Sequence, residues 1–108
     1  MTHKYIAVTE ILMELEKDLR EMYLWDFESP SAEALASTEP FAIDTLNFSQ
    51  WLQFIFIPRL YLMIEHGLPL PNNCDVAPMA EEYFQSVNIN STTIIRHLKN
   101  IDSVLTDN

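Results

Sequence analysis

PFAIDTLNFSQWLQFIFIPR, residues 40–59, carries the clearest signals for the fold in this 108-residue sequence. It is dense in aromatic and aliphatic side chains, and Pro58 lies inside what its neighbours predict to be a helix. Asn47 and Gln50 have the spacing of a capping box, which predicts that the helix begins at Phe48. Because Pro58 has no N–H and its ring presses on the preceding turn, we expect the helix to be kinked there.

The end of this helix is marked as clearly as its start. Gly67 can adopt the left-handed conformation that follows a helix, and Leu68 can then contact Met63 across the last turn. Pro69 prevents the helix from continuing. The sequence therefore predicts one long helix over residues 48–66.

Two other segments have apolar side chains at helical spacing. The first stripe comprises Tyr5, Val8, Leu12, Leu15, Leu19 and Met22, and the second comprises Ile94, Leu98, Ile101 and Leu105. Short helices are expected after Ser29, as a cap, and from Pro78. Gly67 is the only glycine, which disfavours strands joined by tight turns. We predict an all-α fold in a single domain, residues 1–108: a small antiparallel helical bundle of three main helices plus one or two short ones.

The charge balance narrows the range of partners. The sequence has 6 Lys and Arg residues against 16 Asp and Glu residues, a formal net charge of -10. Affinity for nucleic acid depends on clustered cations that neutralise phosphates, so direct nucleic-acid binding is not expected. An acidic surface suits either simple solubility or a basic protein partner. We expect a protein partner. This partner is either a different protein or a second copy of the chain, which would make a homodimer.

No segment is expected to enter a membrane. The apolar run from Trp51 to Ile64 is interrupted by Gln53, Pro58 and Arg59, and it is shorter than the ~18 to 20 apolar residues that span a bilayer. The N-terminal residues mix charges with apolar side chains, unlike a signal peptide. The expected location is the cytoplasm.

The residues that could perform chemistry are scattered. His3, His66 and His97 have no metal-ligand spacing, and we expect them on the surface or at helix ends. Asp18 is expected on the wet face of the first helix. Cys74 has no Lys or Arg nearby in sequence that would activate its thiol. We therefore predict no catalytic residue, no metal site and no cofactor.

Within the long helix, Phe56, Leu60 and Met63 form an apolar row close to Trp51. Apolar side chains at helical spacing are usually core, and this is the interpretation that we favour. The alternative is an exposed patch, in which Trp51, Phe56, Leu60 and Met63 form a candidate interaction surface. The two interpretations differ in whether this chain or another one covers the row.

Asp44 and Arg59 are the charged residues that stand among apolar neighbours in the stretch of residues 40–59. A guanidinium can bind a carboxylate through two parallel hydrogen bonds. We predict that Asp44 and Arg59 form a structural ion pair.

Several short segments in the middle of the chain resemble a known family in order and spacing: Pro40–Phe41, Asp44–Thr45, Gln50–Phe54, Ile57–Arg59, Leu68–Pro71 and Val76–Pro78. They resemble the YqcC-like family of small bacterial proteins of unknown function, over nearly the whole chain. The resemblance implies a compact helical bundle from a Gram-negative bacterium and an association with tRNA pseudouridine synthase C. It supplies no catalytic residues.

The chain itself does not resemble a pseudouridine synthase. Those enzymes use an aspartate in a setting such as RLDxxTSG on a large mixed α/β scaffold. The comparable segment here, Ile43–Leu46, has neither the arginine nor the glycine.

Three hypotheses for function follow. The first is a non-catalytic protein-interaction or structural module. The second is an accessory factor to tRNA pseudouridine synthase C, which binds that enzyme without touching RNA. The third is a small-molecule binder in the bundle core, with a pocket lined by Trp25, Trp51 and Tyr83.

Overall fold

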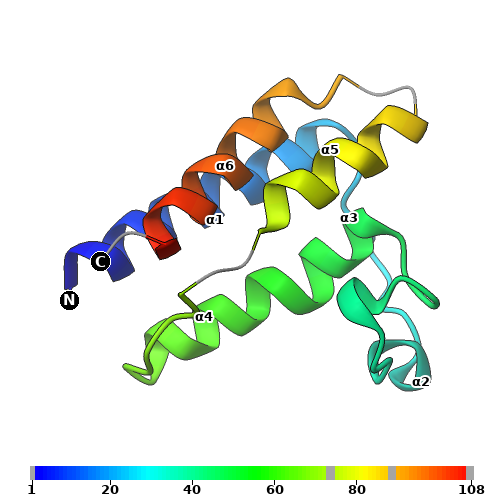
Figure 1. The fold of residues 1–108 in the computed structure, drawn as a ribbon. Helices are drawn as coiled ribbons and strands as arrows, with labels where there is room; N and C mark the ends of the chain where they lie inside the picture. The colour runs from blue at the N-terminus through cyan, green and yellow to red at the C-terminus, as the bar shows by residue number, and fades with distance from the viewer. Residues whose placement is uncertain (1, 73–74, 88–89, 107–108) are drawn as a thin grey trace.

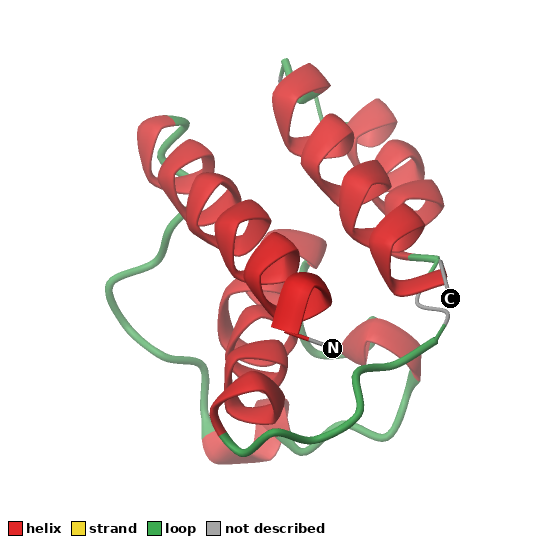
Figure 2. Ribbon diagram, turned by 90° about the vertical axis from the view of Figure 1, so that its left-hand side faces the viewer, coloured by secondary structure: helices red, strands yellow, loops and turns green. Residues whose placement is uncertain are grey.

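The computed structural model describes residues 2–72, 75–87 and 90–106. In these ranges every regular element is a helix and none is a strand, as Figure 1 and the turned view in Figure 2 show. Three helices lie together in the upper half of Figure 1: α1 (Thr2–Glu21), α5 (Val76–Ser86) and α6 (Thr92–Thr106). The predicted all-α fold is confirmed.

The first and last helices, α1 and α6, pack antiparallel along each other (Figure 1). The residues where they meet are 0% exposed: Val8, Leu12, Leu15, Leu19, Ile94, Leu98, Ile101 and Leu105. Both predicted stripes are thus confirmed as core, although Tyr5 and Met22 at the ends of the first stripe are only half-buried. α5 packs against α6 as well.

The predicted long helix is present below this group, as α3 (Phe48–Trp51), η2 (Leu52–Phe56) and α4 (Ile57–Glu65) in direct succession. Its start is the predicted capping box, in which the side chains of Asn47 and Gln50 each accept from the other residue's backbone N–H. Its end is also as predicted. Gly67 has φ 65°, and the N–H of Leu68 donates to the carbonyl of Met63 at 2.8 Å.

The interruption expected at Pro58 takes the form of a wider turn, the π-helical segment η2. The N–H of Ile57 donates to the carbonyl of Leu52, five residues earlier. Proline has no N–H to give to the preceding turn, and widening that turn lets the chain continue as a helix on both sides. A π turn of this kind is one of the recognised causes of a helix kink.

Two short elements connect α1 to the long helix: α2 (Ala32–Leu35) and the 3-10 turn η1 (Pro40–Ala42). The cap of α2 is Ser31, whose Oγ accepts from the N–H of Ala34 at 3.0 Å, so the prediction of Ser29 as the cap was wrong. The hydroxyl of Ser29 donates to the carbonyl of Pro30 instead.

A side-chain amide fixes the segment that follows α1 onto the π turn. Gln53, which is 6% exposed, accepts from the N–H of Asp26 at 2.8 Å and donates to the carbonyl of the same residue at 2.7 Å. The amide thus pairs with Asp26 as a neighbouring peptide group would. A third bond, from Gln50 Nε2 to Asp26 Oδ2 at 3.2 Å, strengthens the attachment.

The start of α5 is capped from another helix. Val76 and Ala77 donate their backbone N–H groups to the two carboxylate oxygens of Asp102 in α6, at 3.0 and 2.8 Å. This helix begins two residues before Pro78, because Asp102 satisfies the first free donors and attracts the positive end of the helix dipole.

We expect Asp102→Asn to lower the free energy of unfolding by about 1 kcal/mol, because an amide keeps only one of the two acceptor oxygens. Asp102→Ala removes both and should cost about 2 kcal/mol. Urea denaturation followed by circular dichroism measures both variants. Equal stability of Asp102→Ala and the wild type would show that these bonds contribute nothing.

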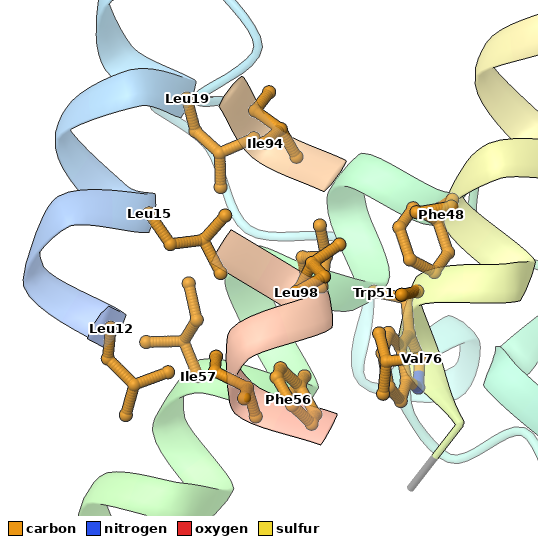
Figure 3. Packing of buried hydrophobic residues seen from close by; sticks show 14 of the residues in the cluster. Leu12, Leu15, Leu19, Phe48, Trp51, Phe56, Ile57, Val76, Ile94 and Leu98 are labelled. Carbon is orange, nitrogen blue, oxygen red and sulfur yellow. The ribbon is translucent and has the colours of Figure 1, made fainter. Parts of the chain in front are cut away.

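One hydrophobic core joins the two groups of helices. Figure 3 shows leucines of α1 and side chains of α6 facing Trp51, Phe56 and Ile57 of the long helix. Trp51, Phe56 and Leu60 are 8%, 3% and 1% exposed, and Met63 is half-buried against the same core. The four residues therefore do not form an exposed patch, because three of them are buried in the core and Met63 is half-buried against it.

None of the helices in the described ranges combines the length and the apolar character that crossing a membrane requires.

Candidate functional site

The predicted ion pair between Asp44 and Arg59 is absent from the salt bridges of the described residues. Asp44 lies just before the long helix and accepts a hydrogen bond from the hydroxyl of Ser37 instead. Ser37 also accepts from the N–H of Glu39 at 3.2 Å, so the carboxylate of Asp44 stabilises the turn that leads into η1. Arg59 is exposed at the start of α4.

The aromatic residues proposed to line a core pocket lie in different surroundings. The ring of Trp25 is covered by the guanidinium of Arg20, 4.5 Å from its centroid. Trp51 is stacked on Phe56 with ring centroids 5.1 Å apart. Tyr83 packs against Phe84 and Phe48 in another part of the aromatic cluster.

A surface groove of about 860 Å³ lies between η1, the long helix and the start of α5. Its floor consists of buried side chains: Trp51, Phe56, Leu60 and Val76. Three of the four residues predicted to form an interaction surface therefore lie at the base of this groove.

The walls of the groove are apolar side chains that the core leaves partly open. Phe54 and Ile55 of the π turn are half-buried, and Leu62 of α4 is 54% exposed. Sequence reasoning did not select these three as functional residues. The only available signal was that the run from Phe54 to Ile57 is apolar all around the helix, while a helix packed on one side needs only one apolar face.

Two charged side chains are among the residues that line the groove. They are Glu39, just before η1, and Arg59 of α4, and no salt bridge joins the two among the described residues. The groove thus combines an apolar interior with one carboxylate and one guanidinium, a combination suited to binding an extended or helical peptide segment.

The backbone beside the groove is strained. Phe41 and Ala42, which line it through η1, have φ values of 56° and 49°, in the left-handed region that L residues avoid. Asp75, next to the lining residue Val76, has φ 49°. Left-handed non-glycine residues and π turns are both enriched at functional sites.

A second, smaller groove of about 350 Å³ shares Phe41 with the first. It is otherwise lined by residues at the start of the long helix and on α5, among them Phe48, Met79 and Tyr83. Ile43, which is 61% exposed, also lines it. Phe41 therefore contributes to both apolar depressions.

A polar pair links α1 and α6 away from the grooves. The side chains of His97 and Asp18 are 12% and 16% exposed. The prediction of Asp18 on the wet face of its helix was therefore wrong, as was that of His97 on the surface or at a helix end, since His97 lies within α6. His97 Nε2 is 2.8 Å from Asp18 Oδ2, but the contact lacks the direction of a hydrogen bond, and Oδ2 has no donor among the described residues. The pair is a close polar contact between two helices, and the described residues offer no third ligand beside it that could hold a metal.

The fold changes the acidity of Tyr61 of α4. Burial raises the pKa of its hydroxyl above the usual value of 10.0, and the Glu16 carboxylate of α1 raises that pKa further. The folded protein then keeps the Tyr61 proton at pH values where the unfolded chain has lost it. Because the unfolded state binds fewer protons there, stability falls as the pH rises above about 10 and is unaffected by this group below it.

We expect Tyr61→Phe to lose less stability than the wild type between about pH 9 and pH 11. Denaturant midpoints measured across this range give the comparison. If both proteins lose stability equally, Tyr61 has the same pKa in the folded and unfolded states.

Within the parts of the chain that the structure describes, no group of three or more His, Cys, Asp or Glu side chains could hold a metal ion. Cys74 lies outside the described residues.

Comparison with known proteins places the chain in a family. The model of the DUF446 family, described as tRNA pseudouridine synthase C, matches residues 7–104. The chain belongs to the DUF446 family. The resemblance to YqcC-like proteins is thereby confirmed.

Two relatives of this DUF446 chain match most of its length. An uncharacterized protein of Haemophilus influenzae is 40% identical over 77 residues, covering 71% of this chain and 73% of that protein. The uncharacterized protein YqcC of Escherichia coli is 32% identical over 96 residues, covering 89% of this chain and 88% of YqcC. The solution NMR structure of YqcC superposes with a TM-score of 0.85 at 31% identity, covering 96% of this chain and 89% of that one. The helical fold is therefore that of the family.

A third relative differs in length. A protein of Pectobacterium carotovorum subsp. carotovorum, named tRNA pseudouridine synthase C, is 39% identical over 66 residues. The match covers 61% of this chain and only 18% of that protein. Most of that longer protein therefore lies outside the part that resembles the DUF446 chain.

Proposed function

We propose that this protein is a non-catalytic docking module, and that the groove between η1, the long helix and α5 holds a segment of a partner protein. The observation that supports this most is the exposed apolar wall of the groove. Leu62, Ile55 and Phe54 stand beside a complete core, so the fold does not need their exposed surface. Partly exposed apolar side chains around a concave surface are the usual composition of a peptide-binding groove.

The strained residues beside the groove support the same proposal. Phe41 and Ala42 occupy a backbone region that costs roughly 1–3 kcal/mol for each residue. In this conformation Phe41 lines both depressions, with its ring 4.7 Å from that of Trp51. A rigid aromatic wall pre-organises a docking site and lowers the entropy lost on binding.

The name of the Pectobacterium relative suggests a specific partner. In that protein, the segment similar to this chain accounts for 18% of a longer chain named tRNA pseudouridine synthase C. A module joined covalently to an enzyme is held near it at high effective concentration, whereas a separate module must bind through an interface. We therefore propose tRNA pseudouridine synthase C as the partner and this chain as its accessory factor.

In this proposal the protein acts in the cytoplasm and contacts the enzyme, without binding the tRNA or a membrane. Its net charge of -10 is the sign that attracts the basic surface of an RNA-binding enzyme and repels RNA itself. The groove is open to solvent, which favours a protein segment over the core-bound small molecule that the sequence left as a third hypothesis.

Direct binding to the purified tRNA pseudouridine synthase C of the same organism tests the proposal. Leu62→Glu places a charge on the groove wall and should weaken binding at least about tenfold. Ile6→Glu is the matched control, because Ile6 is 55% exposed on α1, nearly the same as Leu62 at 54%. Equal affinity of the two variants would contradict docking in the groove.

The accessory role has its own test. Pseudouridine in tRNA is quantified by mass spectrometry in cells with and without the gene, and we expect a lower content at the synthase's site when the gene is deleted. An unchanged content, together with no binding to the synthase, would remove this enzyme as the partner.

A further inference from the structure

Arg59 is the cation among the residues that line the groove, and it has no salt-bridge partner in the described parts of the chain. It is one of six Lys and Arg residues in the chain, and the nearest others in sequence are Arg20 and Arg96. It lines the groove beside Pro58 and Leu62. No salt bridge or side-chain hydrogen bond joins it to any residue within the ranges that the structure describes.

Two carboxylates that could be its counterion do not pair with it. Asp44, its expected partner, accepts a hydrogen bond from Ser37. Glu39 lines the same groove, on the connection that leads into η1, and forms no salt bridge with Arg59. By contrast, the guanidinium of Arg20 has partners within the chain. It donates a hydrogen bond to the carboxylate of Glu16 at 3.0 Å and covers the ring of Trp25.

We infer that the groove binds an apolar peptide segment that has a carboxylate, and that this carboxylate pairs with the guanidinium of Arg59. The inference rests on the proposed docking function and specifies the chemistry of the segment. Apolar side chains of the segment cover Phe54, Ile55 and Leu62 and remove water from the groove. In that environment a bidentate arginine–carboxylate pair is stronger than the same pair at an open surface.

Glu39 also lines the groove, and its carboxylate limits where the acidic group of the segment can lie. A carboxylate next to Glu39 is repelled, so the acidic group of the segment lies beside Arg59. The net negative charge of the chain attracts cations over longer distances. A basic segment is therefore the main competing occupant, and the experiment must distinguish it from an acidic one.

A phage-displayed library of random dodecapeptides, selected on the immobilised full-length protein, identifies the preferred chemistry without knowledge of the partner. We expect the enriched peptides to contain Asp or Glu next to aromatic or aliphatic residues. For the best synthetic peptide, Arg59→Glu should raise Kd at least about tenfold, and Arg59→Lys should raise it less, because lysine keeps the charge but not the bidentate geometry.

Arg96→Glu is the matched control for charge, because Arg96 is also exposed and lies on α6, away from the groove. It should change Kd less than about twofold. Enrichment of basic peptides, or the same effect of Arg59→Glu and Arg96→Glu, would overturn the assignment of a carboxylate-bearing segment.

Leu62→Glu and Ile6→Glu separate this inference from the proposed function. If Leu62→Glu abolishes peptide binding while Arg59→Glu leaves it intact, docking in the groove is supported, but the pairing of a peptide carboxylate with Arg59 is refuted. If no peptide is enriched, or if Leu62→Glu and Ile6→Glu change the peptide Kd equally, both the carboxylate inference and the docking function are refuted.

Discussion

Phe56→Ala is expected to lower the free energy of unfolding by about 3–5 kcal/mol, the usual cost of removing a buried phenylalanine ring. Phe56 is 3% exposed and stacks on Trp51, and it lies where side chains from α1, α6 and the long helix meet (Figure 3). Neighbouring side chains cannot move far enough to fill the cavity that the substitution leaves, because they belong to three different helices. Urea denaturation followed by far-ultraviolet circular dichroism measures the loss.

Leu62→Ala is the control for this prediction, since Leu62 lies on the same long helix but is 54% exposed. Its cost should stay below about 1 kcal/mol. A loss for Phe56→Ala no greater than that for Leu62→Ala would mean that Phe56 belongs to the surface, as the rejected patch interpretation required.

Gln53→Leu is expected to cost about 2–3 kcal/mol although leucine has nearly the volume of glutamine and is more hydrophobic. The two hydrogen bonds between the Gln53 amide and the backbone of Asp26 are lost, and that N–H and carbonyl are left next to an apolar side chain. The segment after α1 should also loosen. Hydrogen exchange at Asp26, measured by NMR, should speed up in step with the loss of stability.

Gln85→Leu is the matched control, because Gln85 is exposed on α5 and has no side-chain hydrogen bond among the described residues. The change there should be within about 0.5 kcal/mol of the wild type. Unchanged exchange at Asp26 in Gln53→Leu, with stability equal to that of Gln85→Leu, would refute the attachment of this segment by the amide.

The parts of the fold that could be predicted depend on local chemistry. The capping box of Asn47 and Gln50 and the left-handed Gly67 involve residues within a few positions of one another, so the sequence alone marks where the long helix begins and ends. The apolar stripes of α1 and α6 are periodic and equally local. The burial of Phe56 and Leu60 follows from the same reasoning.

The parts that could not be predicted depend on contacts between distant segments. Asp102 caps α5 from 26 residues away in sequence, and Gln53 holds Asp26 across 27 residues. Nothing local distinguishes these side chains from ordinary surface groups. The ion pair predicted between Asp44 and Arg59 was wrong for a different reason: Ser37, only seven residues before Asp44, donates a hydrogen bond to its carboxylate.

The groove could be predicted from the sequence only in part. The residues of its floor, Trp51, Phe56 and Leu60, were predicted as part of a surface patch and not as the base of a depression. The depression forms because η1 and the strained Phe41 stand above the helix on one side, and positive φ at a non-glycine residue has no sequence signature. Sequence periodicity thus locates the core helix, while tertiary contacts create the site on it.

A partner protein that docks in the groove must lie close to Leu62. Benzoylphenylalanine incorporated at position 62 in living cells, followed by ultraviolet irradiation and mass spectrometry, detects such a partner, with position 6 as the equally exposed control. We expect a crosslinked adduct with tRNA pseudouridine synthase C from position 62 and none from position 6. Adducts of the same kind and yield from both positions, or from position 6 alone, would show that the partner does not dock in this groove.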